Sequence, residues 1–312
     1  MALLAIDRRL SFLSRYLHTD LSIQQYIYYI HQIIMHICIA LFLKDAVRYL
    51  QSYLFQKLDD LEHFYKTKHT FSYILYDNDS SDYTAEFMKM FSKLPSREGR
   101  VHVHVKTYMD KTQSRQDMLN VFRDQLCQSD WTLFIDNNIY FEVEYLKHML
   151  YNASHAGIIT CNSISVQPNI GDNAAEKPFV SSKHYYDTYS CVDINYNLHY
   201  PVCQSPECTL KSCEEACVPK WNQSNNIVEV QSAWGGFVLV NSKAFRHEDV
   251  VWDTVSVDNN MLNIDDNEIN FTYTEENKKC MCEHVLFCNK VKNALSRPIV
   301  IVTDISPYWI AS

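Results

Sequence analysis

The spacing of apolar residues changes along the chain, and each change marks a predicted helix or strand. Residues 1–33 are predicted to be helical, because Leu10, Leu13 and Leu17 lie on one face at helical spacing. Short apolar runs rich in β-branched residues predict buried strands, and the longer stretches between them return to helical spacing. The predicted strands are 35–42, 71–76, 101–106, 131–135, 157–161 and 298–303, and the predicted helices are 44–66, 84–91, 114–126 and 142–154.

This alternation of strands and helices is typical of βαβ units, so we expect an α/β fold with a mostly parallel central sheet. Ligands of such sheets bind at the carboxyl ends of the strands. Two polar clusters follow predicted strands: DNDSSDYT, which begins at Asp77, and DNN, which begins at Asp136. Their positions predict a ligand site at this edge of the sheet.

The helix–strand pattern stops near residue 165 and resumes near residue 227. The intervening segment is rich in Asn, Ser, Pro, Tyr and Cys and is too long for a plain loop, which indicates an insertion. Regular structure is expected again over 227–240, which contains the run SAWGGFVLV. We therefore divide the chain into an N-terminal helical extension, a first half, a Cys-rich insertion and a second half, at 1–33, 34–165, 166–226 and 227–312.

Composition narrows the possible functions. The chain has 312 residues, of which 47% are hydrophobic, enough for one large globular domain with a sizeable core. Its five glycines are so placed that neither a dinucleotide-binding fingerprint nor a Walker-A phosphate loop can form. The formal net charge of −9 argues against a general nucleic-acid binder, which needs a basic surface.

The cysteines and an apolar N-terminal stretch bear on the cellular compartment. Four of the eleven cysteines cluster in the insertion, at Cys203, Cys208, Cys213 and Cys217. Disulfides, a structural zinc site and free thiols are all open, because the spacing lacks paired Cys-x-x-Cys knuckles. The uncharged stretch 26–43 is predicted to be a helix end running into a buried strand, rather than a membrane span. Without a clear signal peptide, we expect a cytoplasmic protein, with the Golgi or ER lumen as the alternative.

Four places along the chain, in order, resemble motifs of the nucleotide-sugar glycosyltransferases of the GT-A fold, of the family-2 kind. They are the strand-end turn Asp77-Asn78-Asp79, Arg115 on the helix before the acidic strand, Asp136-Asn137-Asn138 in place of a D-x-D motif, and Trp234-Gly235-Gly236 followed by Glu283-His284. The resemblance covers roughly 34–165 and 227–305, and its order and spacing carry more weight than any single motif. The chain resembles the short members of this family from fungi and large DNA viruses.

The resemblance implies a GT-A-like three-layer α/β/α sandwich and transfer of a sugar from a nucleoside-diphosphate donor to a hydroxyl group of a glycan or glycoprotein acceptor. The half 34–165 would bind the donor, and 227–312 would bind the acceptor. The donor contacts implied are Asp77, Asn78, Asp79, Arg115, Trp234, Gly235 and Gly236. The ligands implied for a divalent cation, Mn²⁺ or Mg²⁺, are Asp136, Asn138 and His284, and the base implied for an inverting reaction is Glu283. No nucleic-acid partner is expected, and membrane association is open.

These residue types suit the chemistry. A diphosphate leaving group gains negative charge as the sugar–phosphate bond breaks, and a divalent cation held by carboxylates and phosphates stabilises that charge. A carboxylate such as Glu283 can deprotonate an acceptor hydroxyl group as its oxygen attacks the anomeric carbon. Two adjacent residues without Cβ, Gly235 and Gly236, let a backbone pass close to a ligand or bend sharply.

Each motif also has a structural interpretation. Asp136 suits a helix cap or turn, and DNDSSD suits an Asx-rich turn that caps the next helix. The double glycine suits a β-bulge. Glu283-His284 suits a solvated loop, or a packed segment given the nearby Cys288.

One departure from the family pattern favours a rival function. Asn138 stands where the family has an acidic residue, which indicates weaker metal binding or a catalytically inactive relative that binds carbohydrate or nucleotide. A nucleotidyltransferase is less supported, because the first strand is followed by Phe42-Leu43-Lys44-Asp45 rather than by a Gly-rich basic loop.

Overall fold

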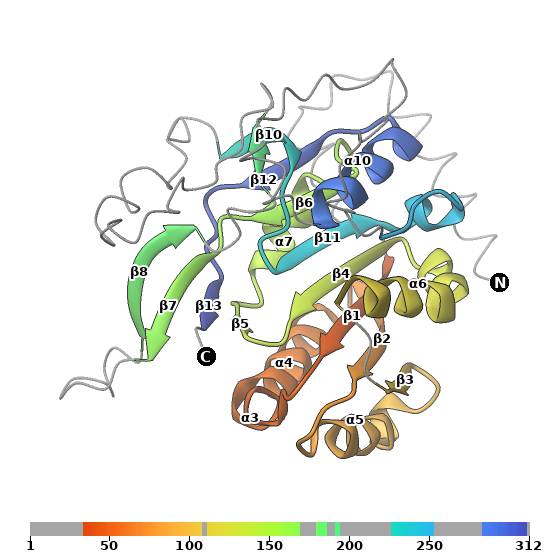
Figure 1. The fold of residues 1–312 in the computed structure, drawn as a ribbon. Coiled ribbons are helices and arrows are strands. Elements are labelled where there is room, and N and C mark those ends of the chain that lie inside the picture. The colour runs from red at the N-terminus through yellow and green to blue at the C-terminus, as the bar shows by residue number, and fades with distance from the viewer. Residues whose placement is uncertain are drawn as a thin grey trace, which may run out of the picture.

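We describe the fold from a computed structural model, which describes residues 34–107, 111–168, 179–185, 191–193, 226–252 and 283–310. These residues form a three-layer α/β/α sandwich around a nine-stranded sheet, with a four-stranded sheet beside it (Figure 1). The predicted α/β class and layer architecture are confirmed. The predicted N-terminal extension 1–33 and the cysteine cluster 203–217 lie outside the described residues.

The strands of the central sheet follow the order β3-β2-β1-β4-β11-β6-β12-β10-β9. Their bounds are β1 Met35–Leu43, β2 His69–Asn78, β3 Val101–Lys106, β4 Trp131–Asp136, β6 Ile158–Cys161, β9 Val192–Asp193, β10 Ile227–Ser232, β11 Phe237–Asn241 and β12 Ile299–Val302. Strands β3, β2, β1 and β4 are mutually parallel, and so are β6 and β12. Strand β11 is antiparallel to both β4 and β6, so the two parallel groups point the same way and the sheet is mostly parallel, as predicted.

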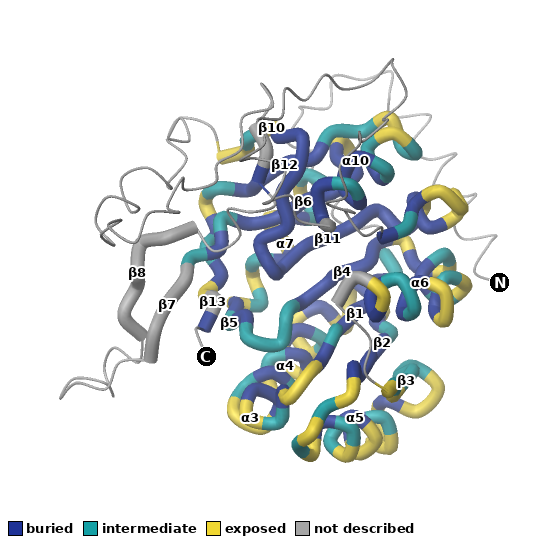
Figure 2. Tube along the Cα trace, viewed as in Figure 1, coloured by how far each residue is buried: buried dark blue, intermediate teal, exposed yellow. Residues whose placement is uncertain are grey.

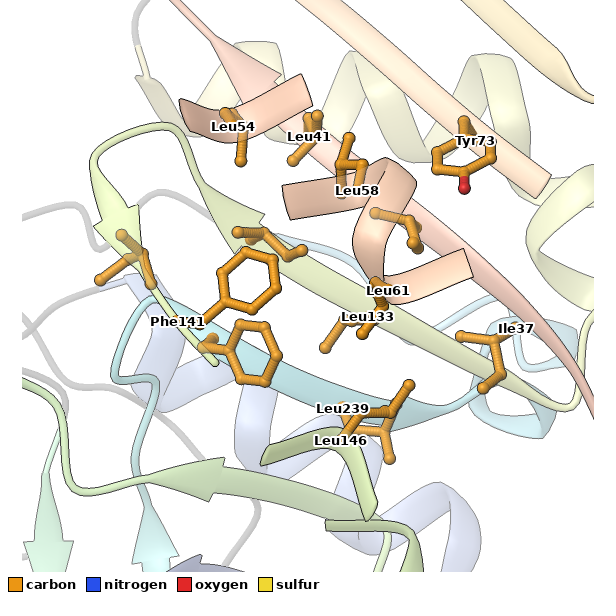
Figure 3. Packing of buried hydrophobic residues seen from close by; sticks show 14 of the residues in the cluster. Ile37, Leu41, Leu54, Leu58, Leu61, Tyr73, Leu133, Phe141, Leu146 and Leu239 are labelled. Atoms are coloured by element: carbon orange, nitrogen blue, oxygen red, sulfur yellow. The ribbon is translucent and has the colours of Figure 1, made fainter. Parts of the chain in front are cut away.

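The central strands are apolar on both faces because helices cover both faces. One face packs against α3 Val47–Tyr49, the π-helical turn η1 Leu50–Leu54, α4 Phe55–Tyr65, α5 Thr84–Ser92 and α7 Tyr145–Tyr151. Figure 3 shows Leu58 and Leu61 of α4 against this face, with Leu133 of β4 beneath them. Burying each such leucine stabilises the fold by about 2 kcal/mol.

The other face of the sheet packs against α6 Lys111–Gln128, α10 Glu283–Leu295 and the 3-10 turn η3 Ser242–Arg246. Alternation along β1 sends Ile37, Ile39 and Leu41 to the α4 face, and Cys38 and Ala40 to the α6 face. Figure 2 shows the result as continuous burial along the central strands, with exposed residues on the outer sides of the helices.

The smaller sheet was not predicted. It has the order β5-β13-β7-β8, with bounds β5 Ile139–Tyr140, β13 Tyr308–Ile310, β7 Ile164–Pro168 and β8 Phe179–Tyr185. Strand β13 is antiparallel to β5 and parallel to β7. Because β5 follows β4 closely, this pairing ties the last described strand of the chain to the end of β4.

The strands agree with the sequence prediction better than the helices do. The predicted strand 101–106 matches β3, and the predicted helix 44–66 is interrupted by the π-helical turn η1. Helix α10 was missed, because two of its buried positions are occupied by His284 and Cys288, which hide the apolar stripe. Residues 35–43 of the uncharged stretch form β1, and no helix within the described ranges is long and apolar enough to cross a membrane.

A buried arginine holds α4, β2 and the short helical turn η2 Pro95–Arg97 together. The side chain of Arg97 is 2% exposed and pairs with the carboxylates of Asp59 and Glu62. Its guanidinium carbon lies 4.4 Å from the ring centroid of Tyr73 and 4.8 Å from that of Phe91. The arginine therefore joins a cation–π contact to a salt-bridge network.

Replacing Arg97 by methionine is expected to lower the free energy of unfolding by about 3 kcal/mol, because the partner carboxylates lose their buried cation. Urea denaturation measures this loss. Arg100→Met is the matched control: its side chain is 35% exposed, it pairs with the same Glu62 at 2.8 Å, and its loss is expected to stay below about 1 kcal/mol. Equal losses in the two variants would contradict the assigned role of burial.

Candidate active site

The carboxyl ends of β1, β2 and β4 meet at one edge of the central sheet (Figure 1). Pairing across the parallel strands aligns Leu43 with Asp77 and Phe42 with Asp136. The two polar clusters therefore flank the end of β1. The prediction that both lie at the same sheet edge is confirmed.

Asp136, the last residue of β4, contacts the double glycine that precedes β11. The backbone N–H of Asp136 donates to the carbonyl oxygen of Gly236 at 2.8 Å. A Cβ atom on Gly236 would lie 3.0 Å from Oδ2 of Asp136 and 2.8 Å from Cδ1 of Ile139. A Cβ atom on Gly235 would lie 2.9 Å from the carbonyl oxygen of Cys161. With φ values of 64° and 70°, both positions favour glycine, and the close approach brings backbone to the Asp136 carboxylate.

Arg115, on α6, lies over the aromatic ring at the end of β1. Its guanidinium carbon is 5.9 Å from the ring centroid of Phe42. Phe134 packs on the α6 face of the sheet, and alternation sends Asp136, two residues later, to the same face. Since Phe42 packs on this face and pairs in register with Asp136, the structure brings Arg115 and Asp136 to the same face and the same end of the sheet.

The turn after β2 is held to the turn after β1 by short polar side chains. The Asp77 carboxylate accepts hydrogen bonds from the backbone N–H of Ser80, at 3.3 Å, and from its hydroxyl group. The hydroxyl oxygen of Ser80 accepts a hydrogen bond from the backbone N–H of Asp45 at 2.8 Å. The Asp45 carboxylate accepts a hydrogen bond from the backbone N–H of Ser81 at 2.7 Å. These bonds, and the one from the backbone N–H of Thr84 to the Asp82 carboxylate at 2.9 Å, confirm the Asx-rich turn, whereas Tyr83, the N-cap residue of α5, makes no side-chain capping bond.

The three predicted donor contacts in this turn differ in exposure. Asp77 and Asn78 are 1% and 3% exposed, whereas Asp79 is exposed and has a φ of 59°. Burial raises the pKa of the Asp77 carboxyl group, and its hydrogen bonds from Ser80 oppose that effect. Asp79 is thus the residue of the three whose side chain reaches solvent, and ligand contact by this turn stays a prediction.

Asn138, at the third position of the D-x-D-like motif, is tied to β13. Its side-chain Nδ2 donates to the carbonyl oxygen of Ile310 at 3.2 Å, and its own carbonyl oxygen accepts the Ile310 N–H at 2.9 Å. Within the part of the chain that the structure describes, no group of three or more His, Cys, Asp or Glu side chains is placed to hold a metal ion. Asp136 therefore supplies the carboxylate of this turn, and the side-chain amide of Asn138 holds the turn to β13.

Trp234 and His284 pack together in the core on the α6 and α10 face. Both are 3% exposed, and their ring centroids lie 4.4 Å apart with the rings nearly parallel. Phe134, Phe287 and Trp252 also surround Trp234, at centroid distances of 5.4, 5.8 and 5.8 Å. His284 is therefore buried in the core of this face, and its role as a cation ligand stays a prediction.

Glu283 is the first residue of α10, and the structure describes its backbone position only. The next residue, His284, stacks on Trp234, which directly precedes the double glycine. The first turn of α10 therefore lies beside the glycine segment that contacts Asp136. Cys288, one turn further on, is buried, and its Sγ donates to the carbonyl oxygen of Ala233 at 3.6 Å, so this segment is packed rather than a solvated loop.

Sequence reasoning missed a row of stacked rings beside Arg115. Phe42, Tyr76 and His104 are paired in register across β1, β2 and β3, and the successive ring centroids are 5.4 Å apart. The Tyr76 hydroxyl group donates to Oδ2 of Asp117 at 2.8 Å, and burial raises the pKa of that hydroxyl group. The sequence does show one aromatic or imidazole ring near the carboxyl end of each of these strands. Recognising that the rings stack requires knowledge of the strand register.

Comparisons with known proteins find no relative by sequence and several distant structural matches. No family model matches the chain, and no curated protein matches it by sequence. Among solved structures, GalNAc-T7 with UDP, GalNAc and Mn²⁺ is 11% identical over 89% of this chain and 44% of its own, with a TM-score of 0.49. Galactosyltransferase LgtC, in complex with donor and acceptor sugar analogs, is 11% identical over 85% of this chain and 72% of its own, with a TM-score of 0.37.

Mannosyltransferase PcManGT from Pyrobaculum calidifontis, in complex with GDP-Man and Mn²⁺, is 11% identical over 45% of this chain and 43% of its own, with a TM-score of 0.33. This chain spans less than half the length of GalNAc-T7 and of PcManGT. At this identity and these TM-scores, the similarities transfer no residue role to this chain.

Proposed function

We propose that this protein is a nucleotide-sugar glycosyltransferase, which moves a sugar from a nucleoside-diphosphate donor to a hydroxyl group of a glycan acceptor. The observation that carries the proposal is the contact of Asp136 with the double glycine at the carboxyl edge of the sheet, on the face where Arg115 lies over Phe42. Mostly parallel sheets bind ligands at this edge, and a carboxylate beside a guanidinium suits a diphosphate with its counter-cation.

In this proposal each side chain has a separate task. Arg115 binds the diphosphate through charge-assisted hydrogen bonds. Asp79 contacts the ribose or base from the turn after β2. The backbone of Gly235 and Gly236 forms the wall against the donor sugar, while the buried Trp234 ring supports that wall from the core. Glu283 deprotonates the acceptor hydroxyl group, which gives inversion at the anomeric carbon.

The donor set suits a divalent cation that is shared with the substrate. Asp136 offers one carboxylate, and Mg²⁺ is commonly bound by one or two carboxylates together with substrate phosphates. Mn²⁺ or Mg²⁺ would therefore be held by Asp136 and the diphosphate, and when bound it would stabilise the negative charge of the leaving group. In this proposal His284 is a core residue rather than a ligand, and Asn138 positions the turn through Ile310.

The test combines turnover and binding in wild type and Glu283→Gln. Wild type is expected to release nucleoside diphosphate from at least one donor of a nucleotide-sugar panel with Mn²⁺ present. Glu283→Gln is expected to lower transfer by about a hundredfold while it binds the diphosphate within about threefold of wild type in calorimetry. The exposed Glu248→Gln is the matched control and is expected to behave as wild type. Full activity of Glu283→Gln would contradict its role as base.

A specific observation favours a second candidate function, a catalytically inactive module that binds nucleotide or carbohydrate. The amide of Asn138 donates to the chain at Ile310, so the turn that would hold the cation has one carboxylate and one residue with a structural role. The same experiment separates the two functions. Tight diphosphate binding by wild type, without turnover of any donor in the panel, would favour the module.

A further inference from the structure

A cavity of about 420 Å³ opens at the amino edge of the central sheet, opposite the candidate active site. Its wall includes the first residues of β1, β2 and β4 and residues of α4 and α7. Among these are Met35, His69 and Trp131. Its volume lies in the range of sites for small organic ligands.

Positive charge surrounds this amino-edge cavity. Its charged lining residues are Lys68, Lys147, Lys243, Arg297 and Asp130. Within the described ranges, none of these four cations forms an ion pair, and the carboxylate of Asp130 accepts the backbone N–H of His36 at 2.8 Å. On a chain with a net charge of −9, four cations around one cavity favour an anionic ligand.

A largely buried imidazole forms part of the cavity wall. His69 is 7% exposed, and burial together with the charge of Lys68 lowers the pKa of its imidazole, while a backbone hydrogen bond at Lys68 opposes that effect. The ring belongs to the lining of the cavity, so a ligand there would contact the imidazole. The ring is fixed by stacking on Tyr65, with centroids 5.5 Å apart.

The cavity also exposes apolar surface. Ile34, Phe64 and Tyr151 line it and are 64%, 48% and 51% exposed, and Trp131 forms part of its wall. Apolar side chains that gather in this way mark a binding surface more often than singly exposed ones do. A simple inorganic anion would leave this apolar surface uncovered.

We propose that the amino-edge cavity binds an amphiphilic anion, a phosphate or similar oxyanion joined to an apolar chain or ring. The head group would lie among the cations and His69, and the apolar part would cover Phe64, Tyr151 and Trp131. Residues 1–33 of this chain are a poor match as occupant, because three arginines outnumber two aspartates there. The same chemistry is found in soluble phosphorylated amphiphiles and in anionic lipids, which the experiment distinguishes.

The test is calorimetric titration of the full chain with dodecyl phosphate, held below its critical micelle concentration. We expect saturable binding at one site, with binding by methyl phosphate and by dodecyl maltoside at least about tenfold weaker. The double variant Lys68→Gln/Lys243→Gln is expected to bind dodecyl phosphate at least about tenfold more weakly than wild type. The matched control is Lys89→Gln/Lys93→Gln, which changes an exposed residue of α5 and the exposed residue directly after it, and it is expected to bind as wild type does.

A second variant separates ligand binding from packing. His69→Phe keeps a ring on Tyr65 but removes the polar imidazole from the cavity wall, so binding is expected to weaken while the chain stays folded. Sedimentation with phosphatidylcholine vesicles, with and without phosphatidic acid, assigns the source: charge-dependent sedimentation indicates a lipid, and its absence a soluble ligand. Lack of dodecyl phosphate binding by wild type, or equal binding by the two lysine double variants, would overturn the proposal.

Discussion

Replacing Asp136 by alanine is expected to lower sugar transfer by about a hundredfold to a thousandfold and to leave the chain folded. The loss follows from removing the carboxylate that, in the proposed function, holds the counter-cation of the diphosphate. The fold is expected to survive because the bond from Asp136 to the carbonyl oxygen of Gly236 uses the backbone N–H. Donor turnover with Mn²⁺ and thermal unfolding followed by circular dichroism measure the two effects.

Two further variants show whether charge is the cause. Asp136→Asn keeps the shape of the side chain and removes its charge, so a loss as large as that of Asp136→Ala is expected. Asp124→Asn, on an exposed position of α6, changes the net charge equally and is expected to retain wild-type turnover. Activity of Asp136→Asn within about threefold of wild type would show that the site needs shape and hydrogen bonding rather than charge.

Replacing Gly236 by alanine is expected to cost about 3 kcal/mol of unfolding free energy and about tenfold in transfer. Part of the cost is backbone strain, because a residue with Cβ at a φ of 70° is disfavoured by about 1 kcal/mol. The rest is crowding, since the new Cβ would lie 2.8 Å from Ile139 and 3.0 Å from Oδ2 of Asp136. The Asp136 carboxylate must then move by a few tenths of an ångström, which lowers the rate, because a displacement of about 1 Å at a reacting site can cost about a hundredfold.

Gly99 offers a matched control for the strain. Its φ is 72°, but a Cβ there would meet no atom within 4 Å. Gly99→Ala is therefore expected to cost about 1 kcal/mol, with unchanged transfer. Chemical denaturation measures the loss of unfolding free energy in both variants, and the difference between the two losses is the cost of crowding. Equal losses would mean that the close approach at Gly236 does not constrain the fold.

The strands of the first half show what can be predicted from a sequence. The apolar runs that become β1 and β4 are short, rich in β-branched and aromatic residues, and bounded by polar turns, and β3 alternates valine with polar residues, so local composition identifies all three strands. Helix α10 was missed because its buried face includes His284 and Cys288, whose burial depends on the aromatic cluster around Trp234. Strand β13 was missed because three residues become a strand only by pairing with β5 and β7.

Part of the candidate site could likewise be predicted from the sequence, and part required the structure. Asp136 and the Asp77 turn could be located because polar residues after apolar strands must fall at one edge of a parallel sheet. The double glycine could be recognised as a place of close approach, but not the atoms that it approaches, because these come from strands β4, β5 and β6. The stacked row of Phe42, Tyr76 and His104 depends on strand register, which the local sequence does not specify.

The sequence by itself determined the α/β alternation, the sheet edge that carries polar residues and the glycine-poor composition, because these depend on neighbouring residues along the chain. Only the tertiary structure decided that Asn138 bonds to Ile310, that His284 packs in the core and that four cations and His69 surround one cavity. Each of these depends on contacts between segments far apart in the chain. Such contacts are set by the packing of whole elements against one another, and local spacing does not record that packing.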